Sequence, residues 1–454
     1  MISEPANGVD AAGASPPPWD SVARGSALLL SARITGNAGF FVAVLLLARA
    51  LGPTGRGTIA FVLVTAMVLG RVVTLGVAEA TTVFAARRPA RRPVLLSNLL
   101  LVAVTGGCLG ALLVCGALLL LPGARPAGIA PVEVGALALG TLVTALVEAG
   151  YAFLLGCGRL RQSALVTASA SWVYALFLGV VWAGPGLTVA RAAFIWAAAE
   201  GVRFIVLLAF SVRGVGLGRP NLRLLRESVA FGLRAWIGSL STFLNFRTDQ
   251  ILMGFIASEA ALGAYAVAVN ASEVLLYLPW AAATALLPVI AREAPGLRIE
   301  RTLRAFRSVA MITGASIVVA ALIGPALIPI VFGDDFDRSV GPFLWLLPGA
   351  GGFAAIAVFS NALVASGSPG LSSLGPIVSL GVGLSLDLIL IPPFGATGAA
   401  SAASAAFLVG GLTALAAYRS TAAFGWRALV LPPRSDLELL RSLPGLLVRQ
   451  LPRR

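Results

Sequence analysis

The stretch from residue 57 to residue 80 reads GTIAFVLVTAMVLGRVVTLGVAEA, and its only ionisable side chains are Arg71 and Glu79. A membrane helix needs about 20 mainly apolar residues, because each residue advances about 1.5 Å through a hydrocarbon layer about 30 Å thick. The stretch therefore predicts a transmembrane helix. Its charged side chains are candidate functional residues, because placing an ionisable group inside a membrane helix costs free energy and such groups often mark a transport path.

Stretches of this kind recur along the whole chain of 454 residues, which is 58% hydrophobic and only 11% charged. Because a soluble domain is nearer one quarter charged, an ordinary soluble enzyme is excluded. We expect an all-α integral membrane protein of about 12 transmembrane helices, most of them separated by Gly or Pro. The predicted spans are residues 25–48, 57–80, 94–121, 132–155, 164–184, 192–212, 229–256, 264–290, 308–332, 342–365, 374–392 and 398–418.

The orientation follows from the basic residues, all 33 of which are Arg. Cytoplasmic loops are enriched in basic residues, and placing both termini inside puts 23 arginines on the cytoplasmic side and 5 outside. The acidic segment 333–337 then lies outside, which agrees with this orientation. The formal net charge of +14 does not indicate nucleic-acid binding, because apolar spans separate the arginines and no folded basic face forms.

The chain also looks duplicated. Aligning Gly57 with Gly263 brings the ends of the following spans, Ala86-Arg87 and Ala291-Arg292, within one residue of each other. Six spans per half make the repeat parallel, and a cleft between two such halves is a transporter architecture. The expected organisation is a disordered cytoplasmic tail 1–24, a six-helix lobe 25–212, a basic linker 213–228, a second lobe 229–418 and a basic, amphipathic or simply solvated tail 419–454.

Charged and polar residues inside the spans fall on stripes at helical spacing. Glu200 and Arg203 are three residues apart and predict a structural ion pair. The spans that correspond between the halves carry the other stripes: Ser26, Arg33 and Asn37; Arg71 and Thr74; Arg234, Ser241, Asn245 and Asp249; Asn270, Glu273, Tyr277 and Thr284. The stripes either hold helices together by buried hydrogen bonds or line a common cavity. In the second case Arg33, Arg71 and Arg247 predict an anionic ligand, since Arg binds phosphate in bidentate fashion.

Metal and disulfide chemistry are not expected. The sequence has no His, the commonest metal ligand, and no cofactor is predicted. Cys108 and Cys115 would lie about 10 Å apart along one helix, too far for a disulfide. With Cys157, they are expected to be small apolar filler residues.

Four motifs carry a resemblance to a known family. They are RALGPTGRG at 49–57; DQILMG at 249–254 with LGAY at 262–265 and LLP at 286–288; LLPG at 346–349 with LVASGSP at 363–369; and IPPFGATGAA at 391–400. Over about residues 25–420 the chain resembles the polysaccharide or oligosaccharide flippases of the multidrug/oligosaccharidyl-lipid/polysaccharide exporter superfamily. It departs at Asn270, where many relatives have Arg, and at Ser368, where a basic residue is common.

The resemblance implies two lobes around a central cleft, in the bacterial inner membrane. It implies a transporter, not an enzyme, that flips undecaprenyl-pyrophosphate-linked oligosaccharide by alternating access for cell-surface polysaccharide synthesis. The expected partners are the lipid-linked glycan, membrane lipids and other polysaccharide-assembly membrane proteins. The alternatives are a multidrug or small-molecule antiporter of the same superfamily and a membrane enzyme of glycan assembly, although the loops are short for an enzyme.

Within that cleft, each polar residue has an expected role. Arg33, Arg71 and Arg247 would hold the pyrophosphate, and Glu273 would pair with an Arg in the empty site or couple to a cation. The residues expected to offer hydrogen bonds to sugar are Asn37, Asn245, Asn270 and Tyr277.

Overall fold

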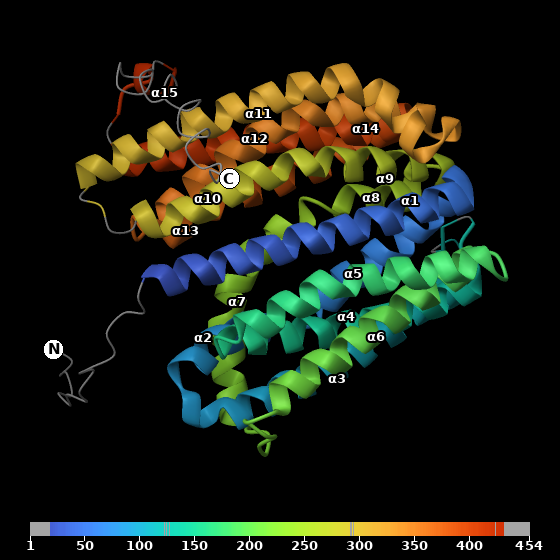
Figure 1. The fold of residues 1–454 in the computed structure, drawn as a ribbon, viewed down its shortest axis with the longest axis horizontal. Coiled ribbons are helices and arrows are strands. Elements are labelled where there is room, and N and C mark those ends of the chain that lie inside the picture. The colour runs from blue at the N-terminus through green and yellow to red at the C-terminus, as the bar shows by residue number, and fades with distance from the viewer. Residues whose placement is uncertain are drawn as a thin grey trace, which may run out of the picture.

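The computed structural model describes residues 19–430 except 122, 124, 127, 291, 292, 294 and 423, and this part of the chain contains helices and no strand (Figure 1). The predicted tails lie largely outside it; where they are described, residues 19–24 begin the first helix and a short helix follows residue 426. The helices are α1 (Trp19–Val72), α2 (Val77–Arg87), η1 (Pro89–Arg91), α3 (Arg92–Leu120), α4 (Pro131–Gly156), α5 (Leu160–Ala183), α6 (Val189–Val212), α7 (Leu222–Leu244), α8 (Thr248–Ile256), α9 (Glu259–Glu273), η2 (Val274–Leu276), α10 (Tyr277–Ile290), α11 (Pro295–Phe332), η3 (Asp334–Ser339), α12 (Val340–Ala365), α13 (Pro369–Ser372), α14 (Leu374–Thr421) and α15 (Arg427–Val430).

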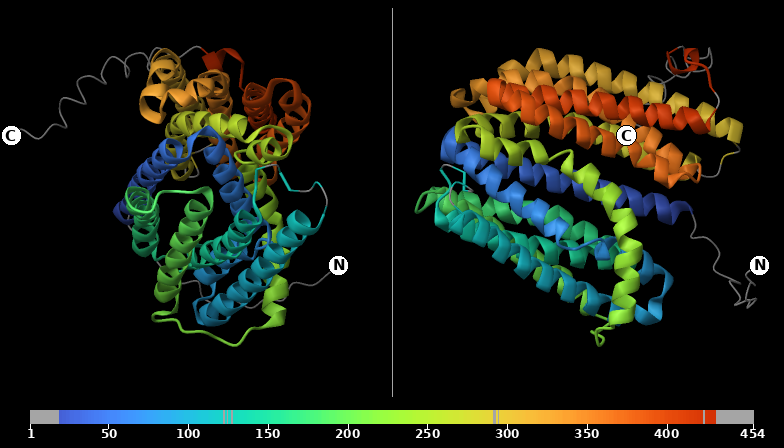
Figure 2. Two further views of the ribbon diagram at one scale, coloured as in Figure 1. Left: turned by 90° about the vertical axis from the view of Figure 1, so that its right-hand side faces the viewer. Right: turned by 180° about the vertical axis from the view of Figure 1, so that it is seen from behind.

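Two of these helices reverse direction in their middle. In α1 the break falls at Gly52, whose φ of 64° and ψ of −176° are not helical, directly before Pro53. In α14 it falls at Gly395, with φ 54° and ψ −127°, after Pro392 and Pro393. Glycine accepts positive φ without steric cost, and proline removes a helical hydrogen bond, so both sequences favour a sharp turn. The blue ribbon in Figure 2 turns back on itself, in agreement with the break at Gly52.

Nine helical segments of the described chain are long and apolar enough to cross a membrane. Two of them, Ser31–Val72 and Gly370–Thr421, contain the reversals and have 42 and 52 residues. A straight helix of 42 residues would extend about 63 Å, about twice the thickness of the hydrocarbon layer. The protein is therefore a multi-pass, all-α membrane protein, whereas the count of twelve crossings stays a prediction.

The predicted span 229–256 is not one continuous helix. The structure divides it into α7 and α8, with turns at residues 245–247, and neither helix is among the nine candidate spans. Helix α7 lies across the direction of the other helices and connects the two halves of the molecule (Figure 2). Its start packs on α2, where Phe84 and Phe231 have ring centroids 5.0 Å apart and the backbones of Gly76 and Gly232 leave no room for a side chain at either position.

The remaining helices form two bundles, an N-terminal half of α1–α6 and a C-terminal half of α8–α14 (Figure 2). The halves meet where α1 crosses α9. A Cβ atom on Gly57 would overlap the carbonyl oxygen of Glu259 and lie 2.9 Å from the nitrogen of Gly263. A Cβ atom on Gly263 would overlap the carbonyl oxygen of Pro53 and lie 3.0 Å from the nitrogen of Gly57. The two glycines aligned by the internal repeat thus touch in a reciprocal contact.

The buried apolar residues join the halves at one end of the bundle and not at the other. The largest cluster includes Leu47 and Phe61 of α1 together with Met253 of α8 and Tyr265 of α9, near the chain reversals. At the opposite end, where α2, α3 and α7 begin or end among many arginines, the clusters are separate. We call this the arginine-rich end. Except for the contribution of α7, the halves are therefore held together mainly at the end that carries Gly57 and Gly263.

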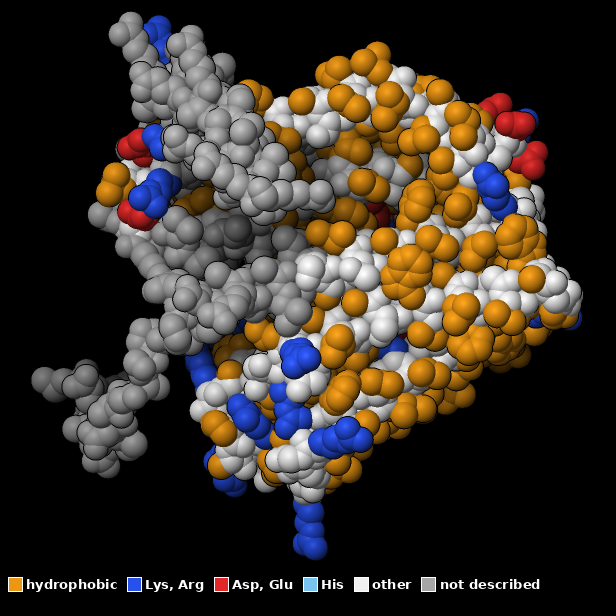
Figure 3. Space-filling model, in the orientation of Figure 1, with side chains coloured by type: hydrophobic (Ala, Val, Ile, Leu, Met, Phe, Trp, Pro, Cys, Tyr) orange, Lys and Arg blue, Asp and Glu red, His pale blue; other side chains and the backbone are white. Residues whose placement is uncertain are grey.

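The outer surface of the bundle is that of a membrane protein. Large apolar side chains are widely exposed, such as Leu112 at 71%, Leu120 at 79% and Leu322 at 75%. Figure 3 shows hydrophobic side chains over most of one face, with charged side chains at the two ends and most of the Arg toward the arginine-rich end. A soluble monomer rarely exposes so large an apolar surface, so lipid is the expected solvent of this face.

Candidate functional site

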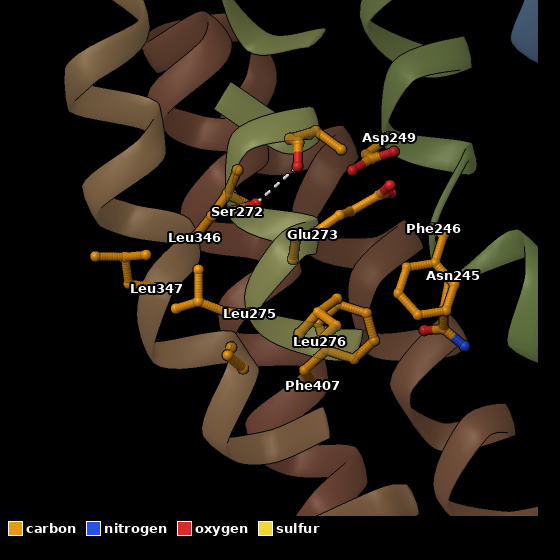
Figure 4. A pocket seen from close by; sticks show the side chains of 14 residues that line it. Asn245, Phe246, Asp249, Ser272, Glu273, Leu275, Leu276, Leu346, Leu347 and Phe407 are labelled. Carbon is orange, nitrogen blue, oxygen red and sulfur yellow. Dashed lines mark hydrogen bonds between the residues drawn. The ribbon is translucent and has the colours of Figure 1, made fainter. Parts of the chain in front are cut away.

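A small hollow lies in the C-terminal half, beside the break between α7 and α8, with about 30 Å³ of space for a water-sized molecule. Figure 4 shows that its polar side chains come from α8, α9 and the turn before α8, and its apolar wall from α12 and α14. The lining residues are Asn245, Phe246, Asp249, Val269, Ser272, Glu273, Leu275, Leu276, Leu346, Leu347, Gly349, Ala350, Ala403 and Phe407.

The turn at residues 245–247 builds the mouth of this hollow. The side-chain amide of Asn245 donates to the carbonyl oxygens of Ser241 and of Pro376 in α14, both at 2.8 Å. The ring of Phe246 packs at 5.5 Å from both Phe353 and Phe407. These contacts anchor the turn to α12 and α14. They also engage the amide hydrogens of Asn245, which leaves its oxygen to face a ligand.

Two charged residues meet at this turn. The guanidinium of Arg247 donates to Glu273 of α9 at 2.6 Å and to the carbonyl oxygen of Phe246 at 2.8 Å. Both side chains are about one fifth exposed, at 20% and 18%. The carboxylate of Glu273 thus partly neutralises the arginine that was predicted to bind an anion.

Asp249 belongs to the same site, although it was not among the predicted binding residues. It accepts a hydrogen bond from the backbone nitrogen of Gln250 at 2.7 Å and another from the hydroxyl of Tyr265. Figure 4 shows its carboxylate next to that of Glu273. Asp387 of α14 also interacts electrostatically with Asp249, and its Oδ1 is buried without a hydrogen-bond partner among the described residues.

Arg33 approaches this group from the other half of the molecule. Its guanidinium carbon lies 3.4 Å from the ring centroid of Trp280 in α10, a cation–π contact. It interacts electrostatically with Tyr277 and Glu273, and Tyr277 in turn interacts with Arg247. The structure therefore brings together five of the predicted site residues, from α1, the turn before α8, α9 and α10: Arg33, Asn245, Arg247, Glu273 and Tyr277.

Arg71 lies in a different environment. Its side chain forms ion pairs with Glu148 at 2.9 Å and with Glu79 at 3.6 Å, within the N-terminal half. Glu79 also accepts a hydrogen bond from Ser239 of α7 at 2.7 Å. No contact in the described part of the chain joins Arg71 to Arg33 or Arg247, so the three arginines do not form one clamp in this conformation.

The other predicted polar residues are more loosely connected. Asn37 lies one turn beyond Arg33 on α1 and is partly buried. Asn270 donates from its side-chain amide to the carbonyl oxygen of Ala266 in its own helix at 2.5 Å. The predicted structural pair of Glu200 and Arg203 is confirmed, with an N–O distance of 3.3 Å.

Sequence patterns contained part of the signal for the residues that were missed. Asp249 follows Asn245 by four residues, and Trp280 follows Tyr277 by three, so both continue predicted stripes. Asp387 carries a different signal, because it is an ionisable residue inside the predicted span 374–392. Phe407 carries none, because α14 meets the site only through tertiary packing. The three cysteines are free, as predicted.

The arrangement favours binding of a polar or charged ligand. Arg33 offers a cation that has no carboxylate ion pair among the described residues, whereas Arg247 offers one that must first leave Glu273. No group of three His, Cys, Asp or Glu side chains in the described chain is placed to hold a metal ion.

Comparisons with known proteins agree with this fold. The lipid II flippase MurJ in an inward closed conformation superimposes with a TM-score of 0.74 at 14% identity, covering 95% of this chain and 94% of that one. An inward-facing multidrug resistance MATE transporter of the MOP superfamily gives a TM-score of 0.66 at 13% identity, covering 87% and 98%. At such low identities the likeness establishes the fold alone.

One curated relative matches in sequence. The probable low-salt glycan biosynthesis flippase Agl15 of Haloferax volcanii is 21% identical over 241 residues, which is 51% of this chain and 51% of that protein. The chain thus spans about half the length of the curated relative that it matches.

A family model provides the strongest assignment. The model described as polysaccharide biosynthesis protein matches residues 22–293, which is more than half of the chain and includes α1 to α10. Together with the two-bundle membrane fold, this match shows that the chain belongs to the polysaccharide biosynthesis protein family.

Proposed function

We propose that the protein flips an undecaprenyl-pyrophosphate-linked oligosaccharide from the inner to the outer leaflet of the bacterial inner membrane by alternating access. Both termini lie in the cytoplasm, so the arginine-rich end faces inward. The sugar travels between the halves while the lipid tail stays in the bilayer. The proposed partners are this lipid-linked glycan, membrane lipids and the membrane proteins that assemble the polysaccharide.

One observation carries this proposal. Arg33 of the N-terminal half packs on Trp280 of the C-terminal half, the half that holds the Arg247–Glu273 pair, with its guanidinium carbon 3.4 Å from the ring centroid. The apolar contact that joins the halves is concentrated at the opposite end from the arginines. An anionic head group entering from the arginine-rich end would therefore reach these residues before it reached the closed end.

Binding would proceed by exchange of ionic partners. The pyrophosphate first contacts Arg33 and then competes with Glu273 for Arg247, because Arg forms bidentate hydrogen bonds with phosphate as well as with carboxylate. Arg71 could join only after leaving Glu148. Asn37, Asn245, Asn270 and Tyr277 then offer hydrogen bonds to the sugar. An anion that leaves a negative-inside cell gains about 2.3 kcal/mol per charge per 100 mV, so the potential favours export.

A multidrug or small-molecule antiporter is the second candidate. The carboxylates of Asp249 and Glu273 in one hollow favour it, because paired acids attract cations. The antiporter hypothesis requires cation binding at this site, whereas the flippase hypothesis requires anion binding. Variants of Arg33, Arg247 and Asp249 therefore distinguish the two hypotheses.

The test is transport in inverted membrane vesicles with a fluorescent lipid-linked glycan. Arg33→Ala and Arg247→Ala should abolish movement of the glycan to the lumenal leaflet while leaving membrane insertion intact. Arg191→Ala is the matched control, because the guanidinium of Arg191 donates to the carbonyl oxygens of Pro185 and Gly186 near a loop, away from the site. Normal flipping by both site variants, together with efflux of cationic dyes that requires Asp249, would reject the flippase in favour of the antiporter.

A further inference from the structure

Arg49 joins the two halves of the molecule at the end of the bundle opposite the arginine-rich end. It is exposed and lies three residues before the reversal of α1 at Gly52. Its Nε donates to the carbonyl oxygen of Val331 and its Nη2 to that of Ile330, both at 3.0 Å. Both acceptors belong to α11 of the C-terminal half, 282 and 281 positions away along the chain. Neither the candidate site nor the proposed binding of the glycan uses this arginine.

The two carbonyl oxygens are available because α11 ends at this point. The last four carbonyl groups of a helix have no amide donor within that helix. Gly333, whose φ is 108°, ends α11, and its amide donates to the carbonyl oxygen of Pro329 at 2.8 Å. The guanidinium of Arg49 donates to the next two carbonyl oxygens, at the end of the helix where a positive charge is favoured. Arg49 therefore caps a helix of the other half.

This cap is a polar contact beside an apolar junction. Val44 and Ala48 of α1 share a buried cluster with Phe332 of α11. The ring of Phe332 also packs against that of Phe41 in α1, with centroids 5.8 Å apart. Apolar contact has no preferred direction, whereas the planar guanidinium holds its donors in a fixed fork that suits two neighbouring oxygens in one arrangement. The hydrogen bonds of Arg49 therefore define how α11 sits on α1.

Alternating access requires this junction to open. The donor lies in the N-terminal half and both acceptors lie in the C-terminal half, so the two hydrogen bonds break when the halves separate here. Because Arg49 is exposed, water replaces part of what the broken bonds contributed. The remaining difference favours the closed arrangement and biases the equilibrium between the two conformations.

We propose that Arg49 is a latch that holds this end of the bundle closed by capping α11, and that its release is a step in every opening of this end. The proposal rests on the alternating access of the proposed function. It does not depend on which ligand is carried, so it applies equally to a flippase and to an antiporter.

The test measures how often this end opens in the full-length protein without ligand. The three native cysteines are replaced by Ala, and spin labels are attached to cysteines introduced by Leu120→Cys at the end of α3 and Asp335→Cys after α11. Both positions are exposed, and they belong to different halves. Double electron–electron resonance in lipid nanodiscs then gives the distribution of distances between the two labels.

Arg49→Met keeps a long apolar side chain but has no hydrogen-bond donor. It should raise the ratio of long to short distances about tenfold, as expected when a hydrogen bond to a charged group is lost. Arg191→Met is the matched control, because the guanidinium of Arg191 also donates to two carbonyl oxygens, those of Pro185 and Gly186 in its own half. It should leave the distances unchanged. Arg49→Lys keeps the charge with donors on one atom only, so it should give a smaller increase, and it serves as the test if Arg49→Met does not insert.

Hydrogen exchange distinguishes a latch from a cap that only stabilises its helix. Without the cap, the backbone amides of residues 330–332 in the last turn of α11 should exchange faster in Arg49→Met than in the wild type. Faster exchange with an unchanged distribution of distances would mean that Arg49 only caps the helix, and would overturn the proposal. An equal shift of distances in Arg191→Met would also overturn it. Because no ligand is present in either measurement, such a failure is distinct from a failure of the proposed glycan transport.

Discussion

The pair formed by Arg247 and Glu273 is the shortest ionic contact of the candidate site, at 2.6 Å. Because both side chains are about four fifths buried, removing one partner leaves the other charge poorly solvated. We expect Glu273→Ala to lower the free energy of unfolding by about 2 kcal/mol, and Arg247→Ala/Glu273→Ala together to cost less than the sum of the single changes. Equilibrium unfolding in mixed micelles measures both quantities.

The pair of Glu200 and Arg203 is a matched control for this double-mutant cycle of Arg247 and Glu273. Its side chains are similarly buried, but its distance is 3.3 Å and its residues are neighbours on one helix. The coupling energy there should be about 0.5 kcal/mol, as is usual for pairs at this spacing. Equal coupling energies for the two pairs would contradict a special role of Arg247 and Glu273.

For single residues, the sequence identifies the charged candidates better than it identifies their ion-pair partners. Arg71, Arg247 and Glu273 stand out because charges are rare inside apolar spans. Their pairing could not be predicted, because Arg71 meets Glu148, 77 positions away, only after α1 and α4 pack together. Glu200 and Arg203 could be paired in advance because the helix itself places side chains three residues apart on one face.

Among the helices, α7 takes part in a surface ion pair at the arginine-rich end. Arg88 after α2 and Glu227 of α7 are 2.7 Å apart. The hydrogen bond from Arg88 lowers the pKa of Glu227, with a further contribution from the charge of Arg91. A carboxyl group that is more acidic in the folded state stabilises it above its ordinary pKa of 4.5, and this stabilisation is lost as the pH falls through the lowered value.

We therefore expect the start of α7 to detach from α2 more readily in acid. Hydrogen exchange of the backbone amides in residues 222–230, corrected for the intrinsic rate, should increase as the pH falls below the ordinary pKa of Glu. Glu227→Gln should show the same exchange at all these pH values. A wild-type profile as flat as that of the variant would mean that the packing of Phe84 on Phe231 holds α7 without help from the ion pair.

The crossing of α1 and α9 makes a second prediction at the scale of elements. Gly57→Ala should destabilise the protein by about 1–3 kcal/mol, because the new methyl group meets the backbone of Glu259, which has little freedom to move. Gly135→Ala in α4 is the control, since nothing lies within 4 Å of the new Cβ. That change should stabilise the helix by up to about 1 kcal/mol. The melting temperatures of the two variants should therefore move in opposite directions.

Helix boundaries followed from sequence where Gly and Pro set them. The turn at Gly52-Pro53 was predicted, and the turn near Pro392-Pro393 was predicted to within a few residues of Gly395. The break at residues 245–247 was not, because Ser241, Asn245 and Asp249 at four-residue spacing suggest one continuous helix. The bond from Asn245 to Pro376 of α14 holds that turn, and a contact between distant segments leaves no local pattern.

For the whole molecule, the proposed orientation can be tested by labelling. In a variant with Cys108, Cys115 and Cys157 replaced by Ala, a cysteine introduced by Asp335→Cys should react with an impermeant maleimide in intact cells. A cysteine introduced by Arg161→Cys should react only after the membrane is opened. The reverse pattern would place the arginine-rich end outside and remove the basis for export of an anion.

The class of fold was predictable because hydropathy and the distribution of arginine are properties of the chain as a whole. Which end of the bundle is closed was not predictable, since both ends contain glycine and apolar residues. Closure depends on where the two halves interlock, and only the structure places Phe61 and Tyr265 in one cluster.

The reciprocal contact between Gly57 and Gly263 has a consequence for the history of the chain. A surface that binds its own copy through the same residues is the isologous interface of a twofold homodimer. The contact therefore has the form expected if an ancestral six-helix protein once paired with a second copy of itself in the same orientation and the two genes later fused. Because each glycine makes room for the backbone beside the other, a larger residue at either position would disturb both halves, so these two positions are expected to evolve as a pair.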